Sequence, residues 1–134
     1  MISQVTDETL DYVWNALEKQ IERALSHGHG DNTTLEEIYQ SLKTNRMFMW
    51  VIHEAEKVIA GVILSIQIFP NKKTLYVEIL AGRDMDSWLP ELERTLVEYR
   101  EIINADTVEA SCRIGLAKIL SNWGVKAISM ELKL

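Results

Sequence analysis

Three groups of side chains in this chain have types and spacings that could carry out chemistry. The first lies in the segment His-Gly-His-Gly-Asp, in which His27, His29 and Asp31 alternate with glycine. Two imidazoles and a carboxylate at this spacing can contact one metal ion from an extended loop. No fourth ligand is obvious, so a solvated loop between two helices is the favoured interpretation and no metal site is predicted.

The second group is a cysteine next to an arginine. Cys112 and Arg113 stand at the end of a run of strand-forming residues. A thiol needs a nearby base to act as a nucleophile, and no histidine is close to Cys112 in sequence. Cys112 is therefore predicted to be a small buried side chain. A guanidinium at a strand end can bind a phosphate or a carboxylate, so Arg113 is either a ligand-binding residue or a surface charge.

The third group is a polar turn at residues 82–87, Gly-Arg-Asp-Met-Asp-Ser. It separates an apolar strand at 74–81 from an amphipathic helix that is predicted from Trp88 to about residue 103. Turns of this kind bind ligands in α/β sheets, because the start of a helix offers free N–H groups and the positive end of its dipole. The turn is therefore a candidate site for an anion.

The residues of this turn also indicate how the helix starts. Pro90 has no N–H, which favours a helix start near Ser87 with Pro90 in the first turn. Asp84 and Asp86 would then lie at or before the cap, where carboxylates accept hydrogen bonds from free amides. Two carboxylates in this position would also repel a phosphate, and Arg83 would offset one of the two charges.

Periodicity and caps predict the helices that position these groups. Apolar residues at helical spacing predict a helix over 10–25, with Thr6 as its N-cap. A shorter helix follows, in which Thr33 and Glu36 form a capping box. A further short helix at 115–123 is predicted to end at a glycine.

The strands complete one mixed sheet. They are predicted at 1–5, 47–53, 58–68, 74–81, 107–112 and 127–132. The order β-α-α-β-β-β-α-β-α-β indicates an α/β (α+β) fold with an antiparallel meander, a parallel crossover through the long helix, and helices on both faces of the sheet. Residues 1–134 are predicted to form one domain. The tryptophans fall in apolar patterns, which predicts packing in the core or an interface for Trp14, Trp50, Trp88 and Trp123.

Charge and composition exclude several classes of partner. The chain has 134 residues, of which 47% are hydrophobic, and 14 basic against 20 acidic side chains give a net charge of −6. Such a field repels nucleic acid and anionic membranes, so neither is a predicted partner. The single cysteine is typical of a reducing compartment, and the start of the chain does not resemble a signal peptide. A cytoplasmic location is expected.

Two segments resemble a known family. The hairpin sequence at 57–62, Lys-Val-Ile-Ala-Gly-Val, is similar to the strand of GNAT acyltransferases that carries a glycine after a polar turn. The segment at 113–125, which ends in Trp-Gly-Val, resembles the penultimate helix of that family and the residues before its last strand. The chain therefore resembles GNAT acyltransferases, and most of all the short GNAT-like proteins of tailed bacteriophages.

The resemblance implies a cofactor site. In the family, acetyl-CoA lies where the third meander strand separates from the strand after the long helix. Its pyrophosphate lies on the helix N-terminus, in an Arg/Gln-x-x-Gly-x-Gly/Ala loop. This chain has a glycine and an arginine there and lacks the second spaced glycine. Acetyl-CoA is the implied cofactor, and its implied contacts are Leu80, Gly82, Arg83, Ser87 and Arg113.

The resemblance also implies a catalytic base. Glu78 lies in the third meander strand, where the family often places the carboxylate that deprotonates the acceptor amine. Regular alternation would put Val77 and Ile79 on one face of the strand and Glu78 on the other, with Tyr76 and Leu80. A solvent-facing glutamate on a half-exposed sheet is the alternative interpretation.

Two hypotheses of function follow. The first is an N-acetyltransferase that moves an acetyl group from acetyl-CoA to an amine of a small molecule or a protein. The second is a non-catalytic protein with the same fold, such as a virion component or a module that binds a host protein. A homodimer is compatible with both, and a phage-encoded chain would act in the host cytoplasm or in the virion.

Overall fold

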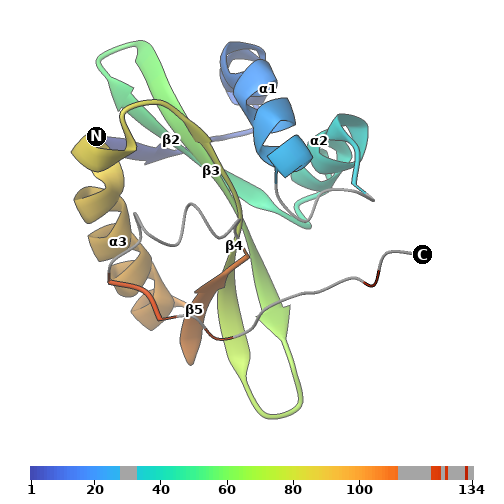
Figure 1. The fold of residues 1–134 in the computed structure, drawn as a ribbon, viewed down its shortest axis with the longest axis vertical. Helices are drawn as coiled ribbons and strands as arrows, with labels where there is room; N and C mark the ends of the chain where they lie inside the picture. Colours follow the sequence, from blue (N-terminus) through green and yellow to red (C-terminus); the bar gives the residue numbers. More distant parts are fainter. Residues whose placement is uncertain (28–32, 112–121, 125, 127–131, 133–134) are drawn as a thin grey trace.

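The computed structural model describes residues 1–27, 33–111, 122–124, 126 and 132 (Figure 1). Its elements follow the predicted order as far as the description extends. They are β1 (Ile2–Gln4), α1 (Leu10–His27), α2 (Leu35–Lys43), β2 (Phe48–Glu54), β3 (Lys57–Ile68), β4 (Lys73–Gly82), α3 (Met85–Ile102) and β5 (Thr107–Ala110). The predicted helix at 115–123 and strand at 127–132 lie outside the described residues, apart from a few isolated positions.

The described strands form one five-stranded sheet in the order β1-β2-β3-β4-β5. Each neighbouring pair from β1 to β4 is antiparallel, whereas β4 and β5 are parallel. The antiparallel meander and the parallel crossover through the long helix are therefore confirmed. The apolar runs of β2 and β3 are buried over several consecutive residues, as expected for central strands that are covered on both faces.

Helices cover both faces of the sheet and create two separate cores (Figure 1). On one face α3 packs against the sheet, and Trp50 and Trp88 are buried in that core. On the other face α1 and α2 pack against the sheet, with Trp14 in the second core. Trp123 packs against the α3 core as a partly buried side chain. The predicted packing role of the tryptophans is confirmed.

Two predicted caps are displaced along the chain. Helix α1 begins at Leu10, so Thr6 is not its N-cap; Thr6 instead forms a turn in which its carbonyl accepts a hydrogen bond from the amide of Thr9. The N-cap of α2 is Thr34, whose hydroxyl accepts a hydrogen bond from the Glu37 amide at 3.1 Å. The predicted box began one residue earlier, because the tandem threonines and glutamates satisfy the same four-residue pattern in two registers.

Helix α3 also starts earlier than predicted. It begins at Met85, after Asp84 in the left-handed conformation with φ 56°. Pro90 therefore lies inside the helix and not in its first turn, and the Asp86 carbonyl loses the amide it would otherwise bind four residues later. The prediction that placed the helix start near Ser87 is wrong, because the start is set by the turn conformation of Asp84.

No helix among the described residues is long and apolar enough to cross a membrane.

Candidate functional site at the β4–α3 junction

Within residues 1–111, strand β4 has an open edge beyond the last residue that pairs with β5. The pairing with β5 covers β4 from Thr74 to Val77. From Glu78 to Gly82, β4 has β3 on one side and no strand from residues 1–111 on the other. Figure 1 shows this divergence, with β5 beside only the lower part of β4. An unpaired strand edge presents backbone N–H and C=O groups that can bind an extended ligand.

A β-bulge marks the start of this open edge. Ile63 of β3 pairs with Ile79, and Leu64 pairs with Val77, so Glu78 is the extra residue on β4. The bulge shifts the alternation of side chains: Val77 packs in the α3 core, whereas Ile79 packs in the core with α1. The prediction that Val77 and Ile79 share one face is therefore wrong.

The bulge places Glu78 beside a buried hydroxyl group. Ser65 is only 7% exposed, and its Oγ donates a 2.7 Å hydrogen bond to Oε2 of Glu78. The Glu78 side chain is half-buried and forms no salt bridge within the described part of the chain. It is thus not fully solvated, and no cation among the described residues neutralises it. A carboxylate that is held at one oxygen and free of a counter-ion can accept a proton from a ligand.

Ser65 is not among the predicted site residues, although its polar side chain stands out in an apolar strand. Ser65 is the one hydroxyl residue in the apolar run of β3 from Val58 to Ile66. A polar side chain in such a run needs a partner when it is buried, and Glu78 across the bulge provides one. Farther from the bulge, the Tyr76 hydroxyl hydrogen-bonds to the Ser111 hydroxyl just after β5.

Glu109 provides a contrast to Glu78. Its carboxylate binds Nζ of Lys72 at 2.7 Å and Nζ of Lys126 at 3.0 Å. The hydrogen bond from Lys72, followed by those from Lys126 and Thr107, lowers the pKa of Glu109 from 4.5 to about 2. Glu109 is therefore a structural anion that fixes residue 126 to β5, and it is a poor proton acceptor near neutral pH.

The predicted cofactor contacts Leu80 and Gly82 lie along the open edge. Leu80 is half-buried against the α3 core. Gly82 has φ +142°, and a Cβ there would come within 2.4 Å of the Ala60 Cβ and 2.7 Å of the Ile59 carbonyl oxygen. The close contact between β3 and β4 therefore explains the glycine by itself, without a cofactor.

The turn after Gly82 is held by hydrogen bonds to its backbone carbonyls. Trp88 donates from Nε1 to the Arg83 carbonyl oxygen at 2.7 Å. Ser87 donates to the Asp84 carbonyl oxygen from both its amide, at 2.9 Å, and its Oγ, at 2.7 Å. The Arg83 side chain is exposed and forms no ion pair with a described residue, so it can reach an anion at the helix start.

Side chains occupy fewer of the backbone amides at the start of α3 than the sequence predicts. Asp84 is the N-cap residue, but its carboxylate makes no capping hydrogen bond, contrary to the prediction. The left-handed conformation of Asp84 accounts for this, because N-cap residues that accept from helix amides normally have extended backbones. The first amides of α3 are thus not taken by the Asp84 side chain, although Asp86 adds a second negative charge to the first turn.

Several predicted site residues lie outside the described residues. They include Cys112 and Arg113, so the structure places neither relative to Glu78. His29 and Asp31 of the His-x-His-x-Asp segment also lie outside. Within the described ranges, no group of three or more histidine, cysteine or acidic side chains could hold a metal ion.

Comparison with known proteins identifies the fold. No family model and no curated protein sequence matches the chain. Solved structures do match over the whole chain. A probable acetyltransferase aligns with a TM-score of 0.73 and 13% identity, covering 100% of this chain and 96% of that one. The chain that contains the β4–α3 junction therefore has an acetyltransferase-type fold.

Two further matching structures contain a bound small molecule. A predicted acetyltransferase from Clostridium acetobutylicum, solved with acetyl-CoA, has a TM-score of 0.70 and 11% identity, covering 100% of this chain and 94% of that one. An aminoglycoside acetyltransferase from an uncultured soil metagenomic sample, solved with trehalose, has a TM-score of 0.69 and 14% identity, covering 100% and 95%. At these identities the likeness establishes the fold, which is the GNAT-like fold that the sequence predicts.

Proposed function

We propose that the protein is an N-acetyltransferase that transfers an acetyl group from acetyl-CoA to an amine. Three features at one end of β4 carry this proposal: a strand edge that no other strand within residues 1–111 covers, a bulge that holds Glu78, and a helix start that the Asp84 carboxylate does not cap. The likeness to a structure solved with acetyl-CoA supports the choice of cofactor.

Some residues of the β4–α3 junction are suited to bind acetyl-CoA, and others oppose it. The open edge of β4 from Glu78 to Gly82 would hold the pantetheine arm through backbone groups. The amides of Met85 and Asp86 at the start of α3 and the exposed Arg83 would hold the pyrophosphate, because the Ser87 amide is already bonded to the Asp84 carbonyl. Asp84 and Asp86 oppose that anion, so the affinity is expected to be weaker than a glycine-rich loop would give. Leu80, Ser87 and Arg113 remain proposed contacts.

Glu78 would act as the base. Acetyl-CoA, when bound, supplies an activated acetyl thioester. Transfer would form a bond from the amine nitrogen to the acetyl carbon and break the carbon–sulfur bond, so that CoA leaves as a thiolate and takes a proton from solvent. The amine nitrogen must lose a proton as it becomes an amide, and the Glu78 carboxylate can accept that proton. The hydrogen bond from Ser65 holds one carboxylate oxygen and leaves the other for the acceptor. The acceptor is proposed to be an amine of a small molecule or of a protein.

A thermal-shift titration with acetyl-CoA tests the proposal. At ten times the dissociation constant, binding stabilises the native state by about 1.4 kcal/mol, which raises Tm by roughly 5 °C in a domain of this size. Arg83→Gln should weaken the shift without lowering the Tm of the free protein, because Arg83 is exposed. Arg94→Gln is the matched control, since Arg94 is an exposed arginine of α3 beyond the first turn. No shift at millimolar acetyl-CoA would refute the proposal.

Substitution of the base separates binding from chemistry. Glu78→Gln should keep the thermal shift and lose acetyl transfer to an amine, because the amide cannot accept the proton. Equal transfer rates in Glu78→Gln and the parent protein would show that Glu78 is not the base.

A second candidate function is a non-catalytic module that binds a protein partner. It is favoured by large apolar side chains at the β3–β4 turn, where Ile68 is 78% exposed and Phe69 is 47% exposed, and by the acidic residues at the start of α3. For a phage-encoded chain, such a partner would be a virion or host protein. A protein that shows no response to acetyl-CoA but forms a complex through this turn would support the module.

A further inference from the structure

Strand β3 has an unpaired edge close to the β3–β4 turn. Its pairing with β2 ends at Leu64, which lies opposite Phe48. Its pairing with β4 continues to Ile68. Residues 66–69, which we call the open β3 edge, therefore have β4 on one side and no strand from residues 1–111 on the other. Figure 1 shows the β3–β4 hairpin extending well beyond the start of β2.

The backbone groups of two residues in the open β3 edge point away from β4. The Phe69 amide donates to the Lys72 carbonyl at 2.8 Å, so these two residues form a hydrogen-bonded pair. Hydrogen-bonded and non-hydrogen-bonded pairs alternate in an antiparallel ladder, so Ile68 and Ile66 belong to non-hydrogen-bonded pairs. Their N–H and C=O groups therefore face the open side, and no described residue forms a hydrogen bond with them there.

The β4 residue opposite Ile68 has the matching orientation. The Lys73 amide donates to Oδ2 of Asp106 at 2.9 Å, and the Lys73 carbonyl accepts from the Asp106 amide at 2.7 Å. Both backbone groups of Lys73 thus point toward β5 and away from β3. This is the geometry of a non-hydrogen-bonded pair, so the outward orientation of the Ile68 backbone rests on two independent observations.

The open β3 edge is also apolar. Ile66, Ile68 and Phe69 are 38%, 78% and 47% exposed. Leu64 packs in the α3 core, and strand alternation places Ile66 and Ile68 on the same face. No charged residue occurs from 58 to 71, although charged side chains are a common means by which edge strands avoid pairing with other chains. Such an edge is suited to accept a further strand.

The segments around the open β3 edge are basic, although the chain has a net charge of −6. Residues 38–53 and 57–77 contain no acidic side chain, and their basic residues are Lys43, Arg46, Lys57, Lys72 and Lys73. Arg46 is exposed and lies two residues before Phe48, where β2 stops covering β3. It forms no salt bridge with a described residue, so its charge is available to an anionic partner.

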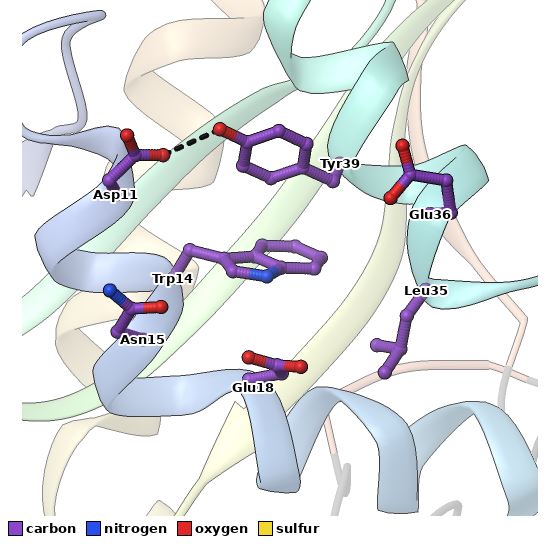
Figure 2. Close-up of a pocket in the computed structure, with 7 residues that line it drawn as sticks. All are labelled: Asp11, Trp14, Asn15, Glu18, Leu35, Glu36 and Tyr39. Carbon is purple, nitrogen blue, oxygen red and sulfur yellow. Dashed lines mark hydrogen bonds between the residues drawn. The ribbon is translucent and has the colours of Figure 1, made fainter.

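The acidic residues near this part of the molecule lie away from the open β3 edge. Asp106 and Glu109 are on the β5 side of β4, two strands from the edge, which is about 10 Å and close to the screening length in physiological salt. Figure 2 shows another acidic group, Asp11, Glu18 and Glu36, around a hollow between α1 and α2. No residue that lines this hollow belongs to β2 or β3.

We propose that the open β3 edge binds an extended acidic segment of a protein partner as an added antiparallel strand. Ile66 and Ile68 exchange backbone hydrogen bonds with this segment, and its apolar side chains pack beside theirs on the α3 face. Its acidic side chains alternate onto the other face, on the side of α2 and Arg46. A second copy of this chain is a poorer occupant, because it would bring two basic segments together.

This inference deepens the second candidate function, for which it names the binding mode and the chemistry of the partner. It does not depend on acetyl transfer, because neither Glu78 nor the start of α3 takes part. Its failure would leave the acetyl-CoA proposal standing, since the two ligands are detected at different amides.

Backbone amide signals of the ¹⁵N-labelled protein test the proposal. The probe is a blocked heptapeptide in which glutamate and valine alternate. We expect it to shift the Ile66 and Ile68 amides saturably and to slow their exchange with deuterated solvent, because both amides gain acceptors. Lysine in place of glutamate tests the charge, methylated valine nitrogens test the backbone donors, and a thymidine oligonucleotide tests for general binding of polyanions. Each of these three should bind more weakly than the probe.

Two variants with the same change in net charge test the location. Arg46→Gln should weaken binding of the probe about threefold at low ionic strength. Lys57→Gln should leave the affinity nearly unchanged, since Lys57 is an exposed basic residue at the other end of β3.

Several outcomes would overturn the proposal. They are equal effects of the two variants, a control ligand that binds as tightly as the probe, and Ile66 and Ile68 signals that do not move. Shifts of these two signals on dilution of the protein alone would identify a second copy as the occupant, and would overturn it as well.

Discussion

Replacement of Gly82 by alanine tests whether this glycine is needed for the fold. The backbone of Gly82 has φ +142°, a conformation that costs a residue with a Cβ about 1–3 kcal/mol. The new Cβ would also lie 2.4 Å from the Ala60 Cβ and 2.5 Å from its Cα, and overpacking of this kind costs about 1–3 kcal/mol. The Gly82→Ala variant should therefore lose about 2–6 kcal/mol of unfolding free energy, a large share of the stability of a typical domain.

Urea unfolding followed by tryptophan fluorescence measures this loss as a lower midpoint at an unchanged m-value. Gly124→Ala is the matched control, because a Cβ at Gly124 would meet nothing within 4 Å. Its unfolding free energy should stay within about 0.5 kcal/mol of the parent value. A similarly small effect of Gly82→Ala would refute the inference that the close contact between β3 and β4 requires this glycine.

A second substitution separates the cost of the backbone strain at residue 82 from the cost of the contact with Ala60. Ala60→Gly in the Gly82→Ala background removes the closest contact, but it leaves the Ala60 Cα, the Ile59 carbonyl at 2.7 Å and the backbone strain. Only partial recovery of stability is expected, and full recovery would show that the clash with one methyl group is the whole effect. The same reasoning explains why Arg83, and not Gly82, is the residue to vary in a test of cofactor binding.

Three further predictions concern stability. Thr34→Ala removes the hydroxyl that caps α2 and should lower the unfolding free energy by about 1 kcal/mol in urea; no change would show that the cap is dispensable. The lowered pKa of Glu109 means that its contribution is complete above pH 4.5 and is lost as the pH falls towards 2, so Glu109→Gln should flatten the acid dependence of stability between these values. For Tyr39 the pH dependence runs the other way, because its pKa is raised. Its contribution to folding stability is present below pH 10 and is lost as the pH rises through the higher pKa of the folded state. Tyr39→Phe should therefore flatten the alkaline dependence, and an unchanged alkaline profile would contradict the Asp11 hydrogen bond.

The periodic elements were predictable from the sequence because burial sets their pattern. The apolar runs of β2 and β3 and the stripe of α1 predict a meander with helices on both faces, and the structure confirms this arrangement. Local caps were predicted less accurately. Tandem threonines before α2 fit the capping pattern in two registers, and only packing of the helix selects Thr34.

The candidate site departs from the sequence pattern at Glu78 and at the start of α3. Regular alternation in β4 fails at Glu78, because a bulge adds one residue there and changes which face Ile79 occupies. The start of α3 depends on the left-handed conformation of Asp84. Asparagine and aspartate adopt this conformation more often than most residues, but the spacing of residues in the sequence does not predict it. Departures from regular geometry of this kind concentrate at functional sites, which is consistent with a ligand at the β4–α3 junction.

The central claim is that acetyl-CoA binds at the open end of β4 and the start of α3. Backbone amide signals in a ¹H–¹⁵N spectrum of the labelled protein test it most directly. Titration with acetyl-CoA should shift the amides from Glu78 to Asp86 saturably and leave those of α2 unchanged. An unchanged spectrum at millimolar acetyl-CoA, or shifts confined to other elements, would contradict the claim.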